Sequence, residues 1–159
     1  MTTTHYARPT GRTQASFNAA VRWLSDHGIG LAGARTLTVV GRTSGVPRTT
    51  PVNPITVDGR TYLISPRGNT QWSRNLRAVG ECEIRHGRSV RAFHATEVTD
   101  ADKVALLRPY LKRWGWEVAN YLPAKVSHRS TDDELLAVAP HVPAFVLTPH
   151  PDHRSSRAA

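Results

Sequence analysis

The sequence predicts an α+β fold in which a small antiparallel β-barrel carries helices at its start, middle and end. Its 159 residues suit one domain. Hydrophobic residues make up 39% of the chain, which is enough for one core and too many for a disordered chain. Several β-branched runs are joined by short turns, as in antiparallel barrels. Because the edges of a small, strongly curved sheet must be covered, we expect the sheet to close or to pair with a second copy as a homodimer.

The chain divides into three predicted parts. Residues 1–12 should form a flexible N-terminus, residues 13–149 a single domain, and residues 150–159 a disordered tail. Within the domain, apolar residues at helical spacing over 13–27 predict a helix that ends at Gly28. No internal repeat and no long linker suggests a second domain.

Three strands should follow this helix, at 35–42, 48–57 and 61–66. Two prolines in the middle run cannot donate to a strand ladder, so this strand should lie at an edge or contain a bulge. The Asp-Gly pair before the third run is a strong hairpin signal, because both positions accept positive φ. The third run should be a central strand.

A short helix and a second hairpin are predicted next. Residues 70–78 read as the helix, with Thr70 as its N-cap. Residues 81–98 should form the hairpin, turning at His86–Gly87. The second arm of this hairpin alternates polar and apolar residues, and we expect His94 to point inward.

The last third of the chain should be mostly helical. A helix should begin after Thr99, and Pro109 should kink or break it. Residues 115–130 show no clear pattern. Residues 131–139 predict a capped short helix and residues 142–149 a closing strand.

The charge balance predicts an anionic partner. Lysine and arginine number 21 against 12 acidic residues, a formal charge of +9. Nucleic acid, a membrane surface and a polyanionic small molecule all satisfy this balance. The basic residues are spread along the chain and most are arginine, which suits bidentate contacts to phosphate or carboxylate.

The sequence disfavours several other classes of protein. No apolar run approaches the length of a membrane span, and the N-terminus lacks the apolar region of a secretory signal, so we expect a cytoplasmic protein. The single cysteine, Cys82, excludes an internal disulfide and should pack in a strand. His150 and His153 have H-x-x-H spacing but fall in the predicted tail, so no metal site is expected. No nucleophile elbow is present, and no paired carboxylates sit at the end of a predicted strand.

The segment GRTSGVPR, residues 41–48, is the first candidate site. If Ser44 and Gly45 form a two-residue turn, Gly41 faces Arg48 and Arg42 lies diagonally from Arg48. The two guanidinium groups could then bind one phosphate or carboxylate, helped by nearby hydroxyls and N–H groups. The alternative is an ordinary solvated turn whose arginines keep it soluble.

Residues 65–76 are the second candidate. A strand ends at Ser65, and Arg67 precedes a helix start, where backbone N–H groups attract anions. Arg74 and Asn75 could then complete the charged site. The alternative is a plain strand-to-helix turn held down by a packed tryptophan.

An aromatic stretch over 108–122 is the third candidate. Tyr110, Trp116 and Tyr121 could line a substrate pocket around a planar ligand, or they could belong to the core. Since few catalytic side chains are present beside a large anion site, a cofactor should do the chemistry.

Residues 36–78 resemble the deazaflavin-dependent nitroreductase family. The shared pattern is a strand, Gly-Arg, a Ser-Gly turn, an arginine three residues on, an Asp-Gly hairpin, a strand ending in serine, and a Trp-x-x-Asn-Leu helix. The resemblance implies a split β-barrel, related to the FMN-binding split barrels, that binds coenzyme F420, with FMN as the alternative cofactor. It implies three groups of cofactor-binding residues: Arg42, Thr43, Ser44, Gly45 and Arg48 at the phosphate and polyglutamate tail; Ser65, Pro66, Arg67 and Gly68 near the ring or its linker; and Trp72, Arg74, Asn75 and Leu76 on the other side.

The function expected from this resemblance is hydride transfer from reduced F420 to a quinone, an activated alkene or a nitro compound. Tyr121, Tyr110 or a bound water could donate the proton, and Tyr121 is the preferred candidate. Thr43 departs from the family, in which many members carry lysine there. The alternatives are a non-catalytic deazaflavin or flavin carrier and a basic nucleic-acid-binding domain. We expect a small-molecule acceptor, weak association with membrane surfaces, and no nucleic acid.

Overall fold

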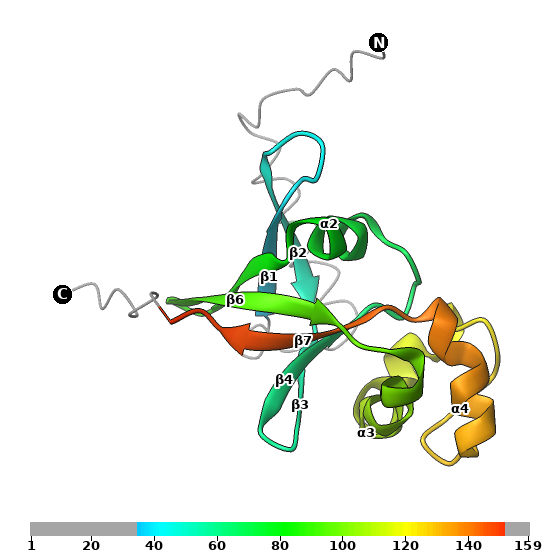
Figure 1. Cartoon of the computed structure of the whole chain (residues 1–159). Coiled ribbons are helices and arrows are strands. Elements are labelled where there is room, and N and C mark those ends of the chain that lie inside the picture. Colours follow the sequence, from blue (N-terminus) through cyan, green and yellow to red (C-terminus); the bar gives the residue numbers. More distant parts are fainter. Residues whose placement is uncertain (1–34, 152–159) are drawn as a thin grey trace, which may run out of the picture.

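The computed structural model describes residues 35–151, and seven strands there form one antiparallel sheet. The predictions for residues 1–12, for the helix at 13–27 and for most of the tail lie outside the described residues. The order across the sheet is β2-β1-β5-β6-β7-β4-β3 (Figure 1). The strands are β1 (Arg35–Val40), β2 (Pro47–Val52), β3 (Ile55–Val57), β4 (Arg60–Ile64), β5 (Glu81–His86), β6 (Ser89–Glu97) and β7 (Ala144–Pro149).

The sheet curls because its two edge strands are neighbours in sequence. β2 and β3 lie at opposite ends of the strand order, yet only Asn53 and Pro54 connect them. Their facing ends are therefore at most about 11 Å apart. The predicted single run at 48–57 is thus two strands, both at edges, which agrees with the edge position expected from its prolines. The curled antiparallel sheet and its flanking helices confirm the predicted α+β class and the barrel-like fold.

Within residues 35–151, three α-helices flank the sheet: α2 (Gln71–Val79), α3 (Asp100–Val118) and α4 (Asp132–Val138). Two short 3₁₀ segments, η2 (Ala119–Tyr121) and η3 (Ala139–His141), follow α3 and α4. In Figure 1, α2 lies beside the β1–β2 hairpin, while α3 and α4 lie together at the other end of the molecule. The helices therefore cover two different parts of the sheet.

Two apolar clusters form the core, and β4 contributes to both. Leu63 belongs to the cluster beneath α2, while the next residue, Ile64, belongs to the cluster beneath α3 and α4. β7 divides in the same way, with Phe145 in the first cluster and Ala144 in the second. β4 is therefore buried on both faces at Leu63 and Ile64, as predicted for a central strand.

The local signals for helix starts and for one hairpin are confirmed. Thr70 caps α2, and Thr131 forms a capping box with Glu134 at the start of α4. Asp58 and Gly59 have φ of 50° and 75°, as their two-residue turn requires.

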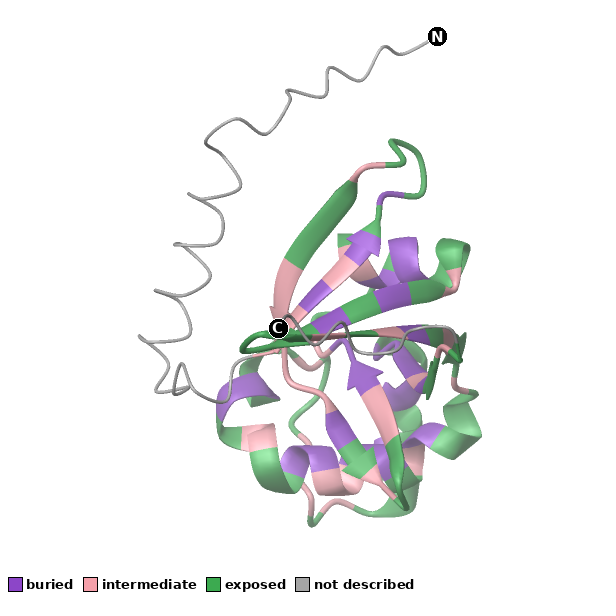
Figure 2. Cartoon of the chain, turned by 90° about the vertical axis from the view of Figure 1, so that its left-hand side faces the viewer, coloured by how far each residue is buried: buried purple, intermediate pink, exposed green. Residues whose placement is uncertain are grey.

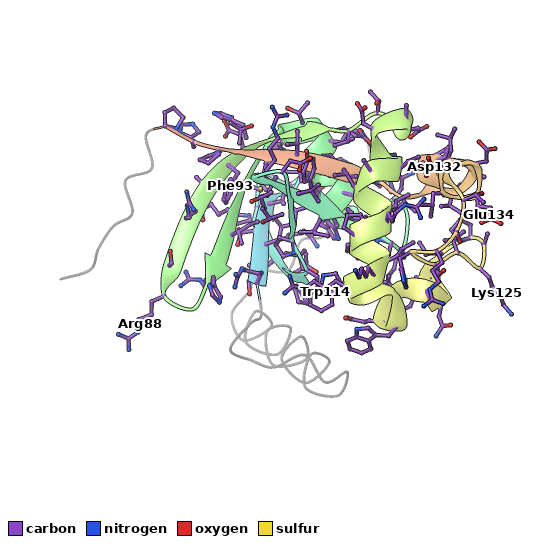
Figure 3. The ribbon with its side chains drawn as sticks, turned by 90° about the horizontal axis from the view of Figure 1, so that it is seen from below. Arg88, Phe93, Trp114, Lys125, Asp132 and Glu134 are labelled. Carbon is purple, nitrogen blue, oxygen red and sulfur yellow. The ribbon has the colours of Figure 1, made fainter. Side chains whose placement is uncertain are left out.

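Two predictions about the hairpin at 81–98 are wrong. His86 pairs with Ser89, so the turn is Gly87–Arg88 rather than His86–Gly87. Arg88 lies at its tip in Figure 3. His94 points outward, and its side chain is 46% exposed. The inward face carries Phe93, whose ring buries far more apolar area than an imidazole would.

Of the two outcomes expected at Pro109, a kink or a break, the break does not occur, because α3 runs through Pro109 as one helix of 19 residues. A proline removes one helical hydrogen bond. Leu107 and Leu111, on either side of it, are almost completely buried. Their burial against the core compensates for the lost bond. No helix within 35–151 is both long and apolar enough to cross a bilayer.

Candidate functional site

The loop between β1 and β2 is longer than predicted. Val40 pairs with Pro47, so the loop covers residues 41–46, and Arg48 lies opposite Val39 rather than Gly41. The N–H of Gly41 donates to the Val46 carbonyl, and that of Gly45 donates to the Gly41 carbonyl, both at 2.9 Å. The predicted two-residue turn at Ser44–Gly45 is therefore wrong. Figure 2 shows the loop as an exposed projection beyond the sheet.

Arg42 joins this loop to the first turns of α2. Its Nη1 donates to Asn75 Oδ1 at 2.8 Å and to Gln71 Oε1 at 3.1 Å. Its backbone N–H donates to the same Asn75 oxygen at 3.2 Å. Asn75 is only 4% exposed, so one buried amide fixes both the main chain and the side chain of Arg42. The two predicted residues are thus brought together from 33 positions apart.

The guanidinium of Arg42 is hydrogen-bonded but forms no ion pair with a described carboxylate. Both of its side-chain acceptors are neutral amides, and within residues 35–151 no carboxylate lies within ion-pair distance of Arg42, Arg67 or Arg74. Some other cations are neutralised: Arg77 pairs with Glu97, and Arg108 with Asp132. Arg42, Arg67 and Arg74 therefore leave uncompensated positive charge around the start of α2.

Arg48 and Arg74 extend this positive surface. Cross-strand partners share a face, so Arg48 lies on the face of Val39, which packs in the cluster beneath α2. Arg74 is exposed and follows Gln71 by three residues, which makes the two neighbours on the helix surface. Three segments of the chain thus present arginines on one side of α2.

The loop offers fewer backbone donors than expected. The N–H of Gly45 is used within the loop, and Ser44 Oγ accepts from the Val46 N–H at 3.2 Å. Gly45 contributes instead through its conformation, since its φ of 68° is costly for other residues. Thr43 and Ser44 are exposed, and no acceptor for their N–H groups lies within the described residues.

The turn before α2 is built by buried hydroxyls. Ser65 is 1% exposed and donates to the Gly68 carbonyl at 2.7 Å. Ser73, also buried, contacts the same carbonyl at 3.5 Å, and Thr70 lies between the two serine hydroxyls. Gly68 adopts a φ of 85°. Ser65 therefore shapes the turn from inside, whereas Arg67 projects from it.

Arg67 meets the third predicted segment. Its guanidinium lies 4.1 Å from the ring centroid of Tyr121, a cation–π contact. Tyr121 belongs to η2 and is 38% exposed. A residue predicted to bind cofactor and a residue predicted to meet substrate are therefore adjacent, 54 positions apart in sequence.

The remaining predicted residues take structural positions. Leu76 is fully buried, and Trp72 packs against Phe145 with ring centroids 6.1 Å apart. Tyr110 is 2% exposed, and burial together with nearby Glu117 raises the pKa of its phenol. Leu76 and Trp72 support the site from the cluster beneath α2, whereas Tyr110 belongs to the cluster beneath α3 and α4.

Trp116 lies apart from this group. It is 65% exposed, and its indole N–H donates to the Arg113 carbonyl at 3.1 Å. Pro66 is half-buried in the turn. Gln71 was absent from the predicted set, although its spacing of four residues from Asn75 places both amides on one side of α2.

The comparison with family models identifies the class of protein. The F420H(2)-dependent quinone reductase family matches residues 12–139, which is most of the chain. The chain belongs to this family and is an F420-dependent oxidoreductase. A search of curated proteins gives no match.

Solved structures agree with the fold class. A Listeria innocua protein assigned as a pyridoxamine 5′-phosphate oxidase matches with 13% identity, TM-score 0.52, and coverage of 84% of this chain and 98% of that one. A protein described as a domain-swapped dimer matches with 13% identity, TM-score 0.51, and coverage of 88% and 99%. An F420-H2 dependent reductase, FDR-A, gives 14% identity, TM-score 0.49, and coverage of 72% and 93%. The split-barrel fold is supported by the first two.

The residues at the start of α2 fit a long polyanionic cofactor. Arg42, Arg67 and Arg74 carry charges that no described carboxylate neutralises, and the first turn of α2 contains no acidic residue. A helix N-terminus favours anions for the same electrostatic reason. This donor set suits coenzyme F420, the cofactor in the name of the family, and the family match gives no support to FMN.

Proposed function

We propose that the chain reduces a quinone or another electron-poor organic acceptor, such as an activated alkene or a nitro compound. When bound, reduced F420 supplies the hydride. The acceptor gains that hydride and one proton, which amounts to a two-electron reduction. The observation that carries the proposal is the attachment of Arg42 to Asn75, because it brings a charged loop against the helix start that the other arginines surround.

The arginines would bind the anionic part of the cofactor. Arg42 is held in place by neutral amides, so little side-chain entropy remains to be lost when an anion arrives. Arg48 and Arg74 would approach the same phosphate or carboxylate groups from the strand and from the helix. The exposed N–H groups of Thr43 and Ser44 would add neutral donors.

Arg67 and Tyr121 would meet the reacting end. The guanidinium over the Tyr121 ring fixes the orientation of that ring. The partly exposed hydroxyl of Tyr121 could then donate the proton that the acceptor needs. The buried turn of Ser65 and Gly68 would hold Arg67 in position.

The first experiment is a titration with oxidised F420, followed by tryptophan fluorescence, with FMN in parallel. We expect saturable binding of F420 and none of FMN. Arg48→Ala should weaken F420 binding by about 1.5–3 kcal/mol, as for a lost charged hydrogen bond. Arg88→Ala, at the tip of the β5–β6 hairpin (Figure 3), removes the same charge elsewhere and should leave the affinity unchanged. An equal loss of F420 affinity in both variants would mean that net charge, rather than a specific site, determines binding.

The role of Tyr121 is tested separately with a benzoquinone as acceptor. Tyr121→Phe keeps the ring beneath Arg67 and removes only the hydroxyl. We expect unchanged F420 affinity and a turnover lower by about 10²-fold or more, the usual contribution of a positioned acid. Unchanged turnover would assign the proton to water. Tight F420 binding by the wild type with no reduction of any acceptor would favour the carrier alternative.

We also propose that two copies associate. The edge strands β2 and β3 each have one unpaired side within the described sheet, and Trp116 is 65% exposed. Light scattering on a sizing column should give twice the monomer mass of 17.5 kDa. A fully active monomer would show that two copies need not associate for activity and would contradict this proposal.

A further inference from the structure

Three strands bring Glu81, His94 and His150 together on the outside of the sheet. Glu81 and His94 are paired directly across β5 and β6. His94 pairs with Thr148 of β7, and the same register places His150 opposite Ala92, so His150 lies diagonally across from His94 on the same face of the sheet. The N–H of His150 donates to the Ala92 carbonyl at 3.0 Å, which continues the ladder and fixes this residue to β6. The backbone that carries the cluster is therefore rigid.

The three side chains face away from the core. Phe93, labelled in Figure 3, is buried, and the alternation along a strand places His94 on the opposite face. Glu81 and His94 are exposed, and His150 is half-buried. The cluster therefore lies at the surface of the fold rather than in the core.

The distances approach those of a metal site. His94 Nδ1 lies 3.7 Å from Glu81 Oε1, and the two imidazole centroids are 4.5 Å apart. One ligand atom from each residue lies within 4.8 Å of the other two. With zinc bonds of about 2.0–2.2 Å, tetrahedral ligands lie roughly 3.3 Å apart. Small rotations of exposed side chains would close the remaining gap.

We propose that Glu81, His94 and His150 bind a divalent transition metal ion, with zinc as the reference case. Two imidazoles and a carboxylate are a preferred ligand set for zinc, and water would complete the coordination. The ion would tie β7 to the β5–β6 hairpin. The sequence pattern predicted no metal site and an inward His94, because the cluster forms only when three strands pair.

This site is separate from the cofactor site. Glu81 directly follows Gly80, the C-cap of α2, whereas Arg42 contacts the first turns of the same helix. A helix of nine residues is about 13 Å long. We therefore assign the ion a structural role, and F420 binding should not require it.

The test uses the full chain, stripped with a chelator and titrated with zinc chloride by calorimetry. We expect one ion per chain and a midpoint of thermal unfolding that rises with zinc, as for any ligand of the native state. Cobalt chloride should give the visible absorption of a low-symmetry site. Glu81→Gln and His94→Ala should each weaken zinc binding at least tenfold, since even outer partners of metal ligands are worth that much.

Two control variants show where the binding occurs. His86→Ala removes a histidine from the other end of β5 and should leave zinc affinity unchanged. His153→Ala removes the second histidine of the H-x-x-H spacing, which lies outside the described residues. Loss of binding in His153→Ala but not in Glu81→Gln would overturn the proposal in favour of the tail. Absence of saturable zinc binding in the wild type would reduce Glu81 and His94 to a surface ion pair.

Discussion

The two sides of α2 differ in the groups that accept hydrogen bonds from an arginine. On one side, Arg42 is held by the amides of Gln71 and Asn75. On the other, Arg77 forms two hydrogen bonds with the carboxylate of Glu97, at 2.6 and 2.8 Å, and one with Asn69. Asn75 and Arg77 are two residues apart, which is 200° around a helix. The same helix therefore presents one charged side and one neutral side.

The kind of acceptor distinguishes an arginine that can bind a ligand from an arginine that stabilises the fold. An arginine fixed by amides is oriented but not neutralised, so its field remains available to an incoming anion. An arginine paired with a carboxylate has lost most of its field and holds the helix to β6 instead. A positive net charge alone would not distinguish these two uses, but the identity of the acceptor does.

Replacement of Arg42 should have the largest effect. Arg42→Ala should weaken F420 binding by about 1.5–3 kcal/mol, which is roughly ten- to 150-fold in Kd. Arg77→Ala changes the net charge by the same amount on the other side of α2 and should leave Kd unchanged. Fluorescence titration gives the Kd of each variant for F420. Similar Kd values for both would contradict the claim that only Arg42 serves F420 binding.

A charge change at Asn75 should have a smaller effect of the same kind. Asn75→Asp preserves shape but places a carboxylate against Arg42, which should weaken F420 binding by about 1–2 kcal/mol. The matched change, Asn69→Asp, places a carboxylate beside Arg77, which Glu97 already neutralises. We expect no change in Kd there. An Asn75→Asp variant that binds as tightly as wild type would show that the charge of Arg42 is not used.

The ion pair on the other side should affect stability alone. Arg77→Met should lower the free energy of unfolding by about 0.2–1 kcal/mol, because both partners are more than a third exposed. Urea denaturation gives this value. A loss well above that range would mean that the pair does more than hold a helix surface.

The smallest expected effect is the pH dependence of the difference in unfolding free energy between wild type and Arg77→Met. The hydrogen bond from Arg77 lowers the pKa of Glu97 below its ordinary value. A depressed pKa in the folded state stabilises the protein above the unfolded pKa, near 4.5. The stability gap between wild type and Arg77→Met should be constant from pH 7 to about pH 5. It should shrink as the pH falls further, and a gap that grows in acid would contradict the assignment.

Sequence patterns predicted those features whose causes are local. The caps at Thr70 and Thr131 and the Asp58–Gly59 hairpin depend on a few adjacent residues, and each is confirmed. The length of the β1–β2 loop was mispredicted because it is set by hydrogen bonds between Gly41, Gly45 and Val46. A Ser-Gly pair does not reveal these bonds.

Long-range pairing accounts for the other differences. The Arg42–Asn75 contact joins residues 33 positions apart, and neither residue type alone indicates it. The face of His94 depends on the register of β6 with β5 and β7, which places Phe93 inside. Cys82, by contrast, is buried as predicted, and burial raises the pKa of its thiol to about 12.

The position of β7 in the strand order has a consequence for protein synthesis. β7 lies between β6 and β4, so before it pairs the sheet consists of two separate pieces, β2-β1-β5-β6 and β4-β3. It is also the C-terminal strand of the described chain. On the ribosome, both pieces would emerge and wait with unpaired edges until this strand is released, a state that invites aggregation. Chaperone demand should therefore be highest just before β7 leaves the ribosome.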